Sequence, residues 1–148
     1  MTDQSAYELS PFPPPVEDYR RLRDIAGMTP FTEEAALRGL PNTLFGVTIR
    51  FEGRAVGMGR IIGDGGCFYV VTDIAVDPAH QRRGLGKRIM AALMEWVRAT
   101  GATSAHVSLI ADKPADRLYA QFGFVDPAPE AIAMEQRLNQ PDVSGSPR

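Results

Sequence analysis

The sequence has little of the chemistry that disulfides and metal sites need. Its 148 residues include one cysteine and two histidines. Cys67 has no partner for an internal disulfide, so nothing requires an oxidising compartment, and these three side chains make no metal-ligand cluster. No apolar run approaches the roughly 20 residues that a membrane-spanning helix needs, and the N-terminus lacks a signal-peptide pattern. We therefore expect no metal, no membrane, and the cytoplasm as the default location.

An excess of charge of one sign is also lacking. The net charge is −2, with 16 basic and 18 acidic residues, so nucleic acid is not an expected partner. The hydrophobic fraction of 44% and the charged fraction of 23% are typical of a soluble globular protein. The length fits one domain, which we place at residues 1–138. Residues 139–148 are polar with two prolines and are predicted to form a disordered tail.

Hydrophobic periodicity predicts an alternating series of helices and strands. Helices are expected at 16–26, 32–39, 85–100 and 114–122, and strands at 7–9, 44–51, 54–62, 67–76, 104–111, 124–125 and 132–137. Short turns make three consecutive strands a meander, and a right-handed crossover makes the next strand parallel. The last two strands are expected to form an antiparallel pair. The predicted fold class is α+β, with a mostly antiparallel mixed sheet and helices on both faces.

The loop between the predicted strand at 67–76 and the helix at 85–100 has the character of a phosphate site. It reads Gln81-Arg-Arg-Gly-Leu-Gly-Lys87. The first turn of a helix has unpaired N–H groups and a partial positive charge, and glycines let a ligand approach the backbone. The spacing fits neither a P-loop, which needs a glycine at position 81, nor a dinucleotide fingerprint, which needs a small residue at position 89.

Two segments resemble a known family. Gln81 to Gly86 is similar to the acyl-CoA loop, Q/R-x-x-G-x-G/A, of the GCN5-related N-acetyltransferase (GNAT) superfamily. Residues 115–124, ADRLYAQFGF, resemble that family's A-x-x-L-Y-x-x-x-G-F segment. The resemblance implies a splayed parallel strand pair that admits the pantetheine arm, and acetyl-CoA as co-substrate. The residues that it implies for acetyl-CoA binding are Ile74, Ala75, Val76, Gln81, Arg82, Arg83, Gly84, Leu85, Gly86, Lys87, Asp112, Ala115 and Tyr119.

Two residues are candidates for catalysis. The resemblance points Tyr119 at the thioester sulfur, where its O–H would stabilise or protonate the leaving thiolate. The alternative is a core aromatic on an amphipathic helix. Asp73, the only acid in the strand at 67–76, is a candidate to relay a proton from the amine. The alternative is a structural carboxylate that caps a loop or pairs with Arg60.

Other polar residues have simpler alternatives. Asp112 stands where many family members have an asparagine that touches the pantetheine arm, and it could instead cap the helix that follows. We expect His80 to be a solvated surface imidazole. Cys67 is expected to be a small buried hydrophobe rather than a nucleophile.

Two functions from different classes fit these patterns. The first is an acetyl-CoA-dependent N-acetyltransferase that acts on a primary amine by direct attack, with a small molecule as the expected acceptor. A peptide or protein acceptor and a homodimer stay open. The second is an acyl-CoA-binding or sensing module with little transferase activity. The retained Tyr119 favours the enzyme.

Overall fold

A mixed five-stranded sheet forms the centre of the molecule. The computed structural model describes residues 4–138, so the predicted tail lies outside the described residues. The strands follow chain order across the sheet: β1 (Tyr7–Ser10), β2 (Phe45–Phe51), β3 (Arg54–Gly63), β4 (Phe68–Val76) and β5 (His106–Ser108). Neighbours are antiparallel except β4 and β5, which are parallel. The mostly antiparallel sheet with one parallel pair is therefore confirmed.

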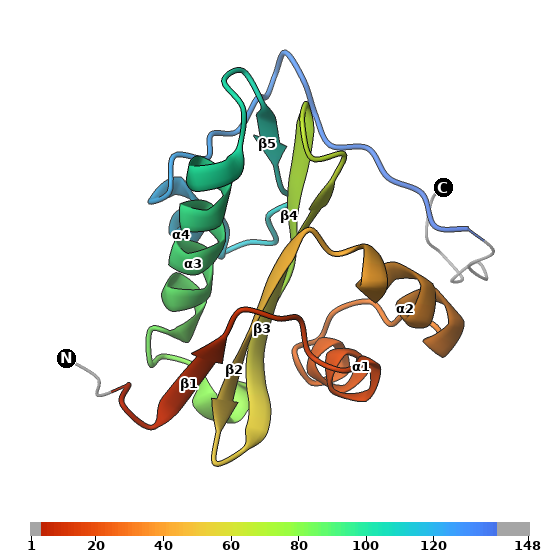
Figure 1. The fold of residues 1–148 in the computed structure, drawn as a ribbon. Coiled ribbons are helices and arrows are strands. Elements are labelled where there is room, and N and C mark those ends of the chain that lie inside the picture. The colour runs from red at the N-terminus through yellow and green to blue at the C-terminus, as the bar shows by residue number, and fades with distance from the viewer. Residues whose placement is uncertain (1–3, 139–148) are drawn as a thin grey trace.

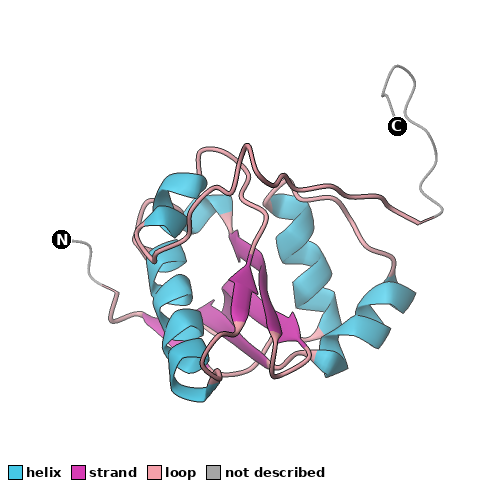
Figure 2. Ribbon diagram, turned by 90° about the horizontal axis from the view of Figure 1, so that it is seen from above, coloured by secondary structure: helices cyan, strands magenta, loops and turns pink. Residues whose placement is uncertain are grey.

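Helices cover both faces of this sheet (Figures 1 and 2). They are α1 (Val16–Ile25), α2 (Glu33–Gly39), α3 (Leu85–Thr100) and α4 (Asp116–Ala120), with 3-10 turns η1 (Leu40–Asn42) and η2 (Pro78–His80). The helices α3 and α4 lie on one face, and α1 and α2 lie on the other. The predicted start of α2 is confirmed, because the Thr32 side chain accepts a hydrogen bond from the Ala35 amide at 3.1 Å.

Each face of the sheet has its own hydrophobic core. On one side, residues spaced four apart on α3, such as Leu85, Ile89 and Leu93, are fully buried against the sheet. On the other side, Tyr19 and Leu22 of α1 pack with Met58 and Ala75. The sheet is therefore held between two apolar layers, and this positions the end of β4 relative to α1 and α4.

The C-terminal third departs from the prediction. The strand predicted at 104–111 is only three residues long, because the chain leaves β4 after Ser108. The helix predicted at 114–122 is shortened to Asp116–Ala120. The antiparallel pair predicted at 124–125 and 132–137 is wrong within the described chain, where residues 124–138 contain no strand. Pro127 and Pro129 lie between the two predicted strands, and neither has an N–H group to donate to a sheet.

Two single-residue expectations are also wrong. Cys67 is exposed rather than buried, because it lies in the turn before β4. His80 is half-buried rather than solvated, and its Nδ1 lies 2.8 Å from the hydroxyl of Tyr7 on β1. The ring of His80 also lies 5.0 Å from the ring of Phe51, so His80 joins the η2 turn to the edge of the sheet.

Candidate active site

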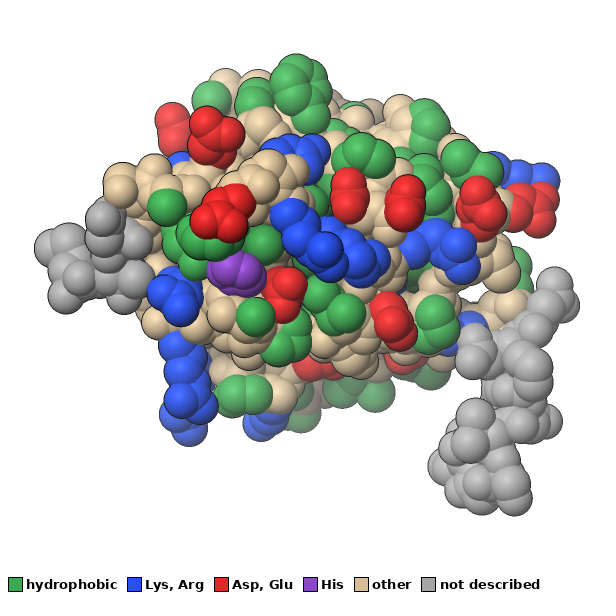
Figure 3. Space-filling model, turned by 90° about the horizontal axis from the view of Figure 1, so that it is seen from below, with side chains coloured by type: hydrophobic (Ala, Val, Ile, Leu, Met, Phe, Trp, Pro, Cys, Tyr) green, Lys and Arg blue, Asp and Glu red, His purple; other side chains and the backbone are tan. Residues whose placement is uncertain are grey.

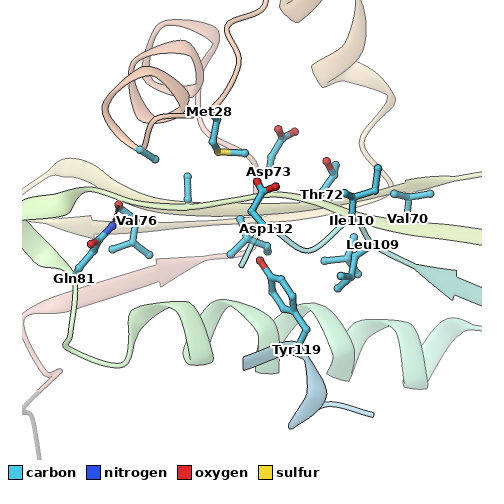
Figure 4. Close-up of a pocket in the computed structure, with 14 residues that line it drawn as sticks. Met28, Val70, Thr72, Asp73, Val76, Gln81, Leu109, Ile110, Asp112 and Tyr119 are labelled. Carbon is cyan, nitrogen blue, oxygen red and sulfur yellow. Dashed lines mark hydrogen bonds between the residues drawn. The ribbon is translucent and has the colours of Figure 1, made fainter. Parts of the chain in front are cut away.

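A cavity opens where β4 separates from the chain that follows β5. Three residue pairs join the two strands, and the last is Val70 with Ser108. Beyond Val70 and Ser108 the two chain segments separate and line a cavity of about 300 Å³. Its walls bring together six of the residues expected to bind acetyl-CoA: Ile74, Ala75, Val76, Gln81, Asp112 and Tyr119 (Figure 4).

A β-bulge in β4 decides which way its side chains point. The pairing register between β3 and β4 shifts between Met58 and Arg60, and Asp73 has a positive φ of 59°. Before the bulge, Val71 packs in the core on the α3 side, whereas Ala75 after it packs on the α1 side. Asp73, at the reversal, points toward α1. The bulge therefore places the Asp73 carboxylate on the face of the sheet that α1 covers.

Both oxygens of the Asp73 carboxylate are engaged in a buried ionic cluster. One accepts from Nη1 of Arg23 on α1. The other accepts from Nε of Arg60 at 2.8 Å and from the hydroxyl of Tyr19 at 2.9 Å. All four side chains are buried, with 2–8% of their surface exposed. We call Tyr19, Arg23, Arg60 and Asp73 the Asp73 cluster.

The contacts of the Asp73 cluster favour the structural alternative for Asp73 over the general base. Both carboxylate oxygens already accept hydrogen bonds from buried side chains, so neither is left free to receive a proton from an amine. The pairing with Arg60 was anticipated, whereas Tyr19 and Arg23 were missed. Their spacing of four residues, which puts both side chains on one face of α1, was the available signal.

Tyr19 gives the Asp73 cluster a measurable pH dependence. Burial raises its pKa to about 12, and the charge and hydrogen bond of Asp73 act in the same direction. The folded protein therefore holds this proton more tightly than the unfolded chain, whose tyrosine titrates at 10.0. The resulting stability is fully present below pH 10 and is lost as the pH rises through about 12.

We expect the loss of stability between pH 10 and about pH 12 to be smaller in Tyr19→Phe than in the wild type. Wild type and variant should differ most in unfolding free energy below pH 10, and the difference should shrink toward pH 12. Urea unfolding at several alkaline pH values measures it. A difference that stays constant over this range would show that Tyr19 does not lose its proton there.

Tyr119 contributes the hydroxyl on the opposite wall. It is buried at the end of α4, and Figure 4 shows its side chain reaching up into the cavity toward Asp112. Burial raises the pKa of Tyr119 above the usual 10.0, and the negative charge of Asp112 adds to the shift. At neutral pH the phenol is therefore protonated and acts as a hydrogen-bond donor.

The Asp112 carboxylate is exposed and faces the same cavity. It makes no hydrogen bond or ion pair with residues 4–138. The alternative that it caps the following helix is wrong, because no side chain in the described chain caps α4. Ala115, by contrast, packs against the core, its N–H donates to the Asp112 carbonyl and its own carbonyl accepts from the amides of Leu118 and Tyr119, so the structure does not present it to a ligand.

The loop from Gln81 to Lys87 lies at the end of β4, beside the cavity. Arg82 and Gly84 have positive φ values of 64° and 78°, which turn the chain sharply into α3. Gly84 is the N-cap of α3 and supplies no side chain to cap it. The first-turn amides, up to Lys87, are therefore available to an anion.

The side chains of this loop have different surroundings. Arg82, Arg83 and Lys87 are exposed, whereas Leu85 is a core residue with 1% exposure. The Gln81 amide donates to the Val76 carbonyl at 3.2 Å. Figure 3 shows basic and acidic side chains intermingled on the underside of the molecule. Attraction of a phosphate therefore depends on the loop amides and their nearest cations rather than on a broad basic surface.

Gly86 gives the cleanest test of this loop. A Cβ there would meet the Leu118 side chain at 3.4 Å, an ordinary contact, whereas a Cβ at Gly84 would lie 2.8 Å from Gln4 in a strained conformation. We expect Gly86→Val to fold and to weaken CoA binding about tenfold or more. The added side chain would crowd the phosphate oxygens, and losing one charge-assisted hydrogen bond to a loop amide costs about 1.5–3 kcal/mol.

Titration calorimetry with CoA measures the effect of Gly86→Val. The matched control is Gly39→Val, because a Cβ at Gly39 on α2 meets nothing within 4 Å. It should bind CoA as wild type does. Equal affinity in both variants would place the pyrophosphate elsewhere.

A sheet that splays beside a glycine-rich anion loop, with a tyrosine in the gap, has the arrangement of a site for an acyl-CoA. The model of the acetyltransferase (GNAT) family matches residues 5–124. The chain belongs to this family, whose members transfer an acyl group from acetyl-CoA. No curated protein gives a significant match. Among the described residues, no helix has the length and apolar character to cross a bilayer.

Solved structures support the family and leave the acceptor open. A probable acetyltransferase of unknown function from methicillin-resistant Staphylococcus aureus is 44% identical, with a TM-score of 0.85 over 88% of this chain and 98% of its own. Glucosamine-6-phosphate N-acetyltransferase from Arabidopsis thaliana has a TM-score of 0.65 at 15% identity, and the match covers 90% of this chain and 99% of that protein's chain. The ribosomal-protein-S18-alanine N-acetyltransferase of Escherichia coli has a TM-score of 0.65 at 20% identity, and the match covers 79% of this chain and 76% of that protein's chain. The last two share only the fold.

Proposed function

We propose that this protein is an acetyl-CoA-dependent N-acetyltransferase that acts in the cytoplasm on the primary amine of a small molecule by direct attack. The observation that carries the proposal is the position of the Tyr119 hydroxyl in the gap beside β4, the strand that ends at Val76 just before the loop at Gln81–Lys87. The cavity of about 300 Å³ is at the small end of the range for small-molecule sites.

The residues present fit acetyl-CoA. In the described part of the chain, no strand pairs with β4 beyond Val70 on the cavity side. The backbone of Ile74, Ala75 and Val76 can therefore pair with an amide-bearing arm as if with an added strand. The amides from Arg82 to Lys87 would hold the pyrophosphate. Acetyl-CoA supplies the acetyl group as a thioester.

The protein's share of the chemistry is mainly positioning. A C–N bond forms to the acceptor amine, the C–S bond breaks, and the electron pair leaves on sulfur. Tyr119 donates a hydrogen bond to that sulfur as charge develops there. Holding the two substrates in line contributes up to roughly 7–11 kcal/mol, and this mechanism needs no metal.

The amine must also lose a proton. At pH 7 only about one alkyl amine in 2,500 is the free base. Because Asp73 is held by its cluster, we assign the attraction of the ammonium form to Asp112, whose carboxylate is unpaired among residues 4–138. Its proton then passes to water. A cationic small-molecule amine is the acceptor class that this arrangement favours.

The ligand can be tested by thermal unfolding. We expect acetyl-CoA and CoA to raise the melting temperature, whereas ATP and NAD do not. At a hundred times its dissociation constant, a ligand stabilises by about 2.7 kcal/mol, or about 5–10 °C for a domain of this size. A shift with ATP or NAD and none with acetyl-CoA would overturn the proposal.

Turnover separates the enzyme from the sensing module. Release of free CoA thiol from acetyl-CoA, followed with a panel of small amines, should rise above the hydrolytic background for at least one cationic amine. Binding without amine-dependent thiol release from any small molecule or peptide would favour the acyl-CoA-sensing alternative.

A further inference from the structure

The loop between η2 and α3 has little support of its own. Residues 81–84 are exposed, and among residues 4–138 no backbone N–H from Arg82 to Lys87 donates a hydrogen bond. Arg82 and Gly84 both have left-handed backbone angles, which a residue with a side chain keeps only where its surroundings enforce them. The conformation of the loop therefore depends on contacts from outside it.

Such contacts come from the N-terminal end of the chain, 73 to 81 residues earlier. Within the loop, the carbonyl of Arg83 accepts a hydrogen bond from Nε2 of Gln4 at 2.6 Å. Just before the loop, Nδ1 of His80 lies 2.8 Å from the Tyr7 hydroxyl. Just after it, Nη1 of Arg88 donates to the Tyr7 carbonyl at 2.8 Å. Figure 1 shows β1 next to the lower end of α3, where this loop lies.

The strand that makes these contacts is itself fixed to the sheet. β1 pairs with β2 along its whole length, with Tyr7 opposite Phe51. Tyr7 is only 6% exposed, and its ring lies 5.0 Å from the ring of Phe51. The loop is therefore tied to the central sheet through β1.

The hydrogen bond from Gln4 determines the direction of one loop amide. The Arg83 carbonyl and the Gly84 N–H belong to the same trans peptide unit, and in a planar trans unit these two groups point in opposite directions. Because Gln4 holds the carbonyl, the Gly84 N–H points away from Gln4, and it has no acceptor within residues 4–138. Glycine adopts left- and right-handed angles about equally well, so without Gln4 this peptide unit is free to turn over.

We propose that Gln4 is a positioning residue for acetyl-CoA, which orients the Gly84 N–H toward the pyrophosphate by holding the carbonyl of the same peptide unit. Tyr7 supports it by fixing the chain on both sides of the loop, at His80 and at Arg88. Gln4 acts through the backbone and touches no reacting atom. This inference rests on the proposed binding of the pyrophosphate by the loop amides, and it adds a residue from the opposite end of the sequence to that site.

Titration calorimetry of Gln4→Met with CoA tests this role. Methionine keeps the length of the side chain and removes the donor, and the hydrogen bond lies at the surface, so the variant should fold as the wild type does. Its dissociation constant for CoA should rise about tenfold, the low end of the effect of losing a hydrogen bond to a charged group.

The matched control for Gln4→Met is Asn42→Leu. The side-chain amide of Asn42 also donates to a backbone carbonyl at the surface, that of Arg38 at 3.0 Å, but it lies in η1, on the other face of the sheet from α3. This variant should bind CoA as the wild type does. An equal loss of affinity in both variants would overturn the inference.

A shortened acetyl donor separates positioning from a general loss of structure. S-acetylpantetheine carries the thioester and the pantetheine arm but lacks the pyrophosphate. With acetyl-CoA, Gln4→Met should raise KM about tenfold and leave kcat within about twofold. With S-acetylpantetheine, kcat/KM should match that of the wild type, whereas a disturbed fold would lower turnover with both donors.

The possible failures of this inference and of the proposed function can be told apart. A wild type that does not bind CoA would overturn the proposed function, and the role of Gln4 with it. A wild type that binds CoA, together with unchanged affinity in Gln4→Met or an equal loss of kcat/KM with S-acetylpantetheine, would overturn the role of Gln4 alone.

Discussion

Replacing Asp73 by asparagine should lower the free energy of unfolding by about 3 kcal/mol, the low end of the range for breaking a buried ion pair. The amide keeps the size of the side chain and tolerates the positive φ of 59° at this bulge. It removes the charge that balances Arg23 and Arg60, which are 6% and 8% exposed. Two cations would then be buried without compensation. Urea unfolding at pH 7 measures the change.

The matched control for this substitution is Glu34→Gln. Glu34 pairs with Arg38 on α2 at 3.0 Å, but both side chains are at least 75% exposed. The same change from carboxylate to amide should cost less than about 0.5 kcal/mol there. Equal effects at the two sites would show that burial of the Asp73 cluster contributes nothing.

Activity of folded Asp73→Asn separates support from catalysis. If Asp73 only holds α1 against β3 and β4, turnover below the melting transition should change little and keep the wild-type pH profile. A loss of more than about 100-fold in a variant that still binds CoA, with the loss of an acidic limb, would restore Asp73 as the general base.

The local patterns of the sequence predicted most of the fold. The amphipathic spacing of α3 and the turns of the meander depend on neighbouring residues, so β2, β3, β4 and α3 appear within a residue or two of their predicted bounds. The alternation of 132–137 predicted a strand as well. Pairing, however, requires a second strand at the right place, which the local pattern does not specify.

The candidate site divides in the same way. The loop at Gln81–Lys87 and Tyr119 were predicted from sequence because a continuous motif carries each, and Gln81 and Tyr119 both line the cavity. The orientation of Asp73 could not be predicted from sequence. Its side chain follows the bulge in β4, which one positive φ and a register shift create. Simple alternation puts Asp73 on the α3 side with Val71, whereas the bulge turns it toward Tyr19 and Arg23.

Tyr119→Phe should lower turnover about 10–100-fold, or about 1.4–2.7 kcal/mol in activation free energy. A normal tyrosine is about 1.5 pKa units less acidic than a simple thiol, so full proton transfer to the thiolate is uphill by about 2 kcal/mol. Burial and Asp112 raise the pKa of Tyr119 further, so the gap widens. The residue therefore acts as a hydrogen-bond donor, and the loss should fall at the low end for acid assistance.

The raised pKa also sets the pH range over which Tyr119 works. Since the folded-state pKa lies above 10.0, the donor is intact at neutral pH and is lost only as the pH rises through that higher value. Wild type and Tyr119→Phe should therefore differ by a constant factor from about pH 7 to 9. A ratio that falls within this range would mean that the phenol ionises earlier than its burial implies.

Two controls separate chemistry from packing at Tyr119. CoA affinity, measured by calorimetry, should be unchanged in Tyr119→Phe, because the ring remains in the core. Tyr69→Phe removes a hydroxyl from another buried tyrosine, which packs against Trp96, and should keep wild-type turnover. The rates are compared in single-turnover experiments with a slow acceptor, so that product release does not mask the chemical step. Full activity of Tyr119→Phe under these conditions would remove the hydroxyl from the mechanism and leave positioning of the two substrates as the source of catalysis.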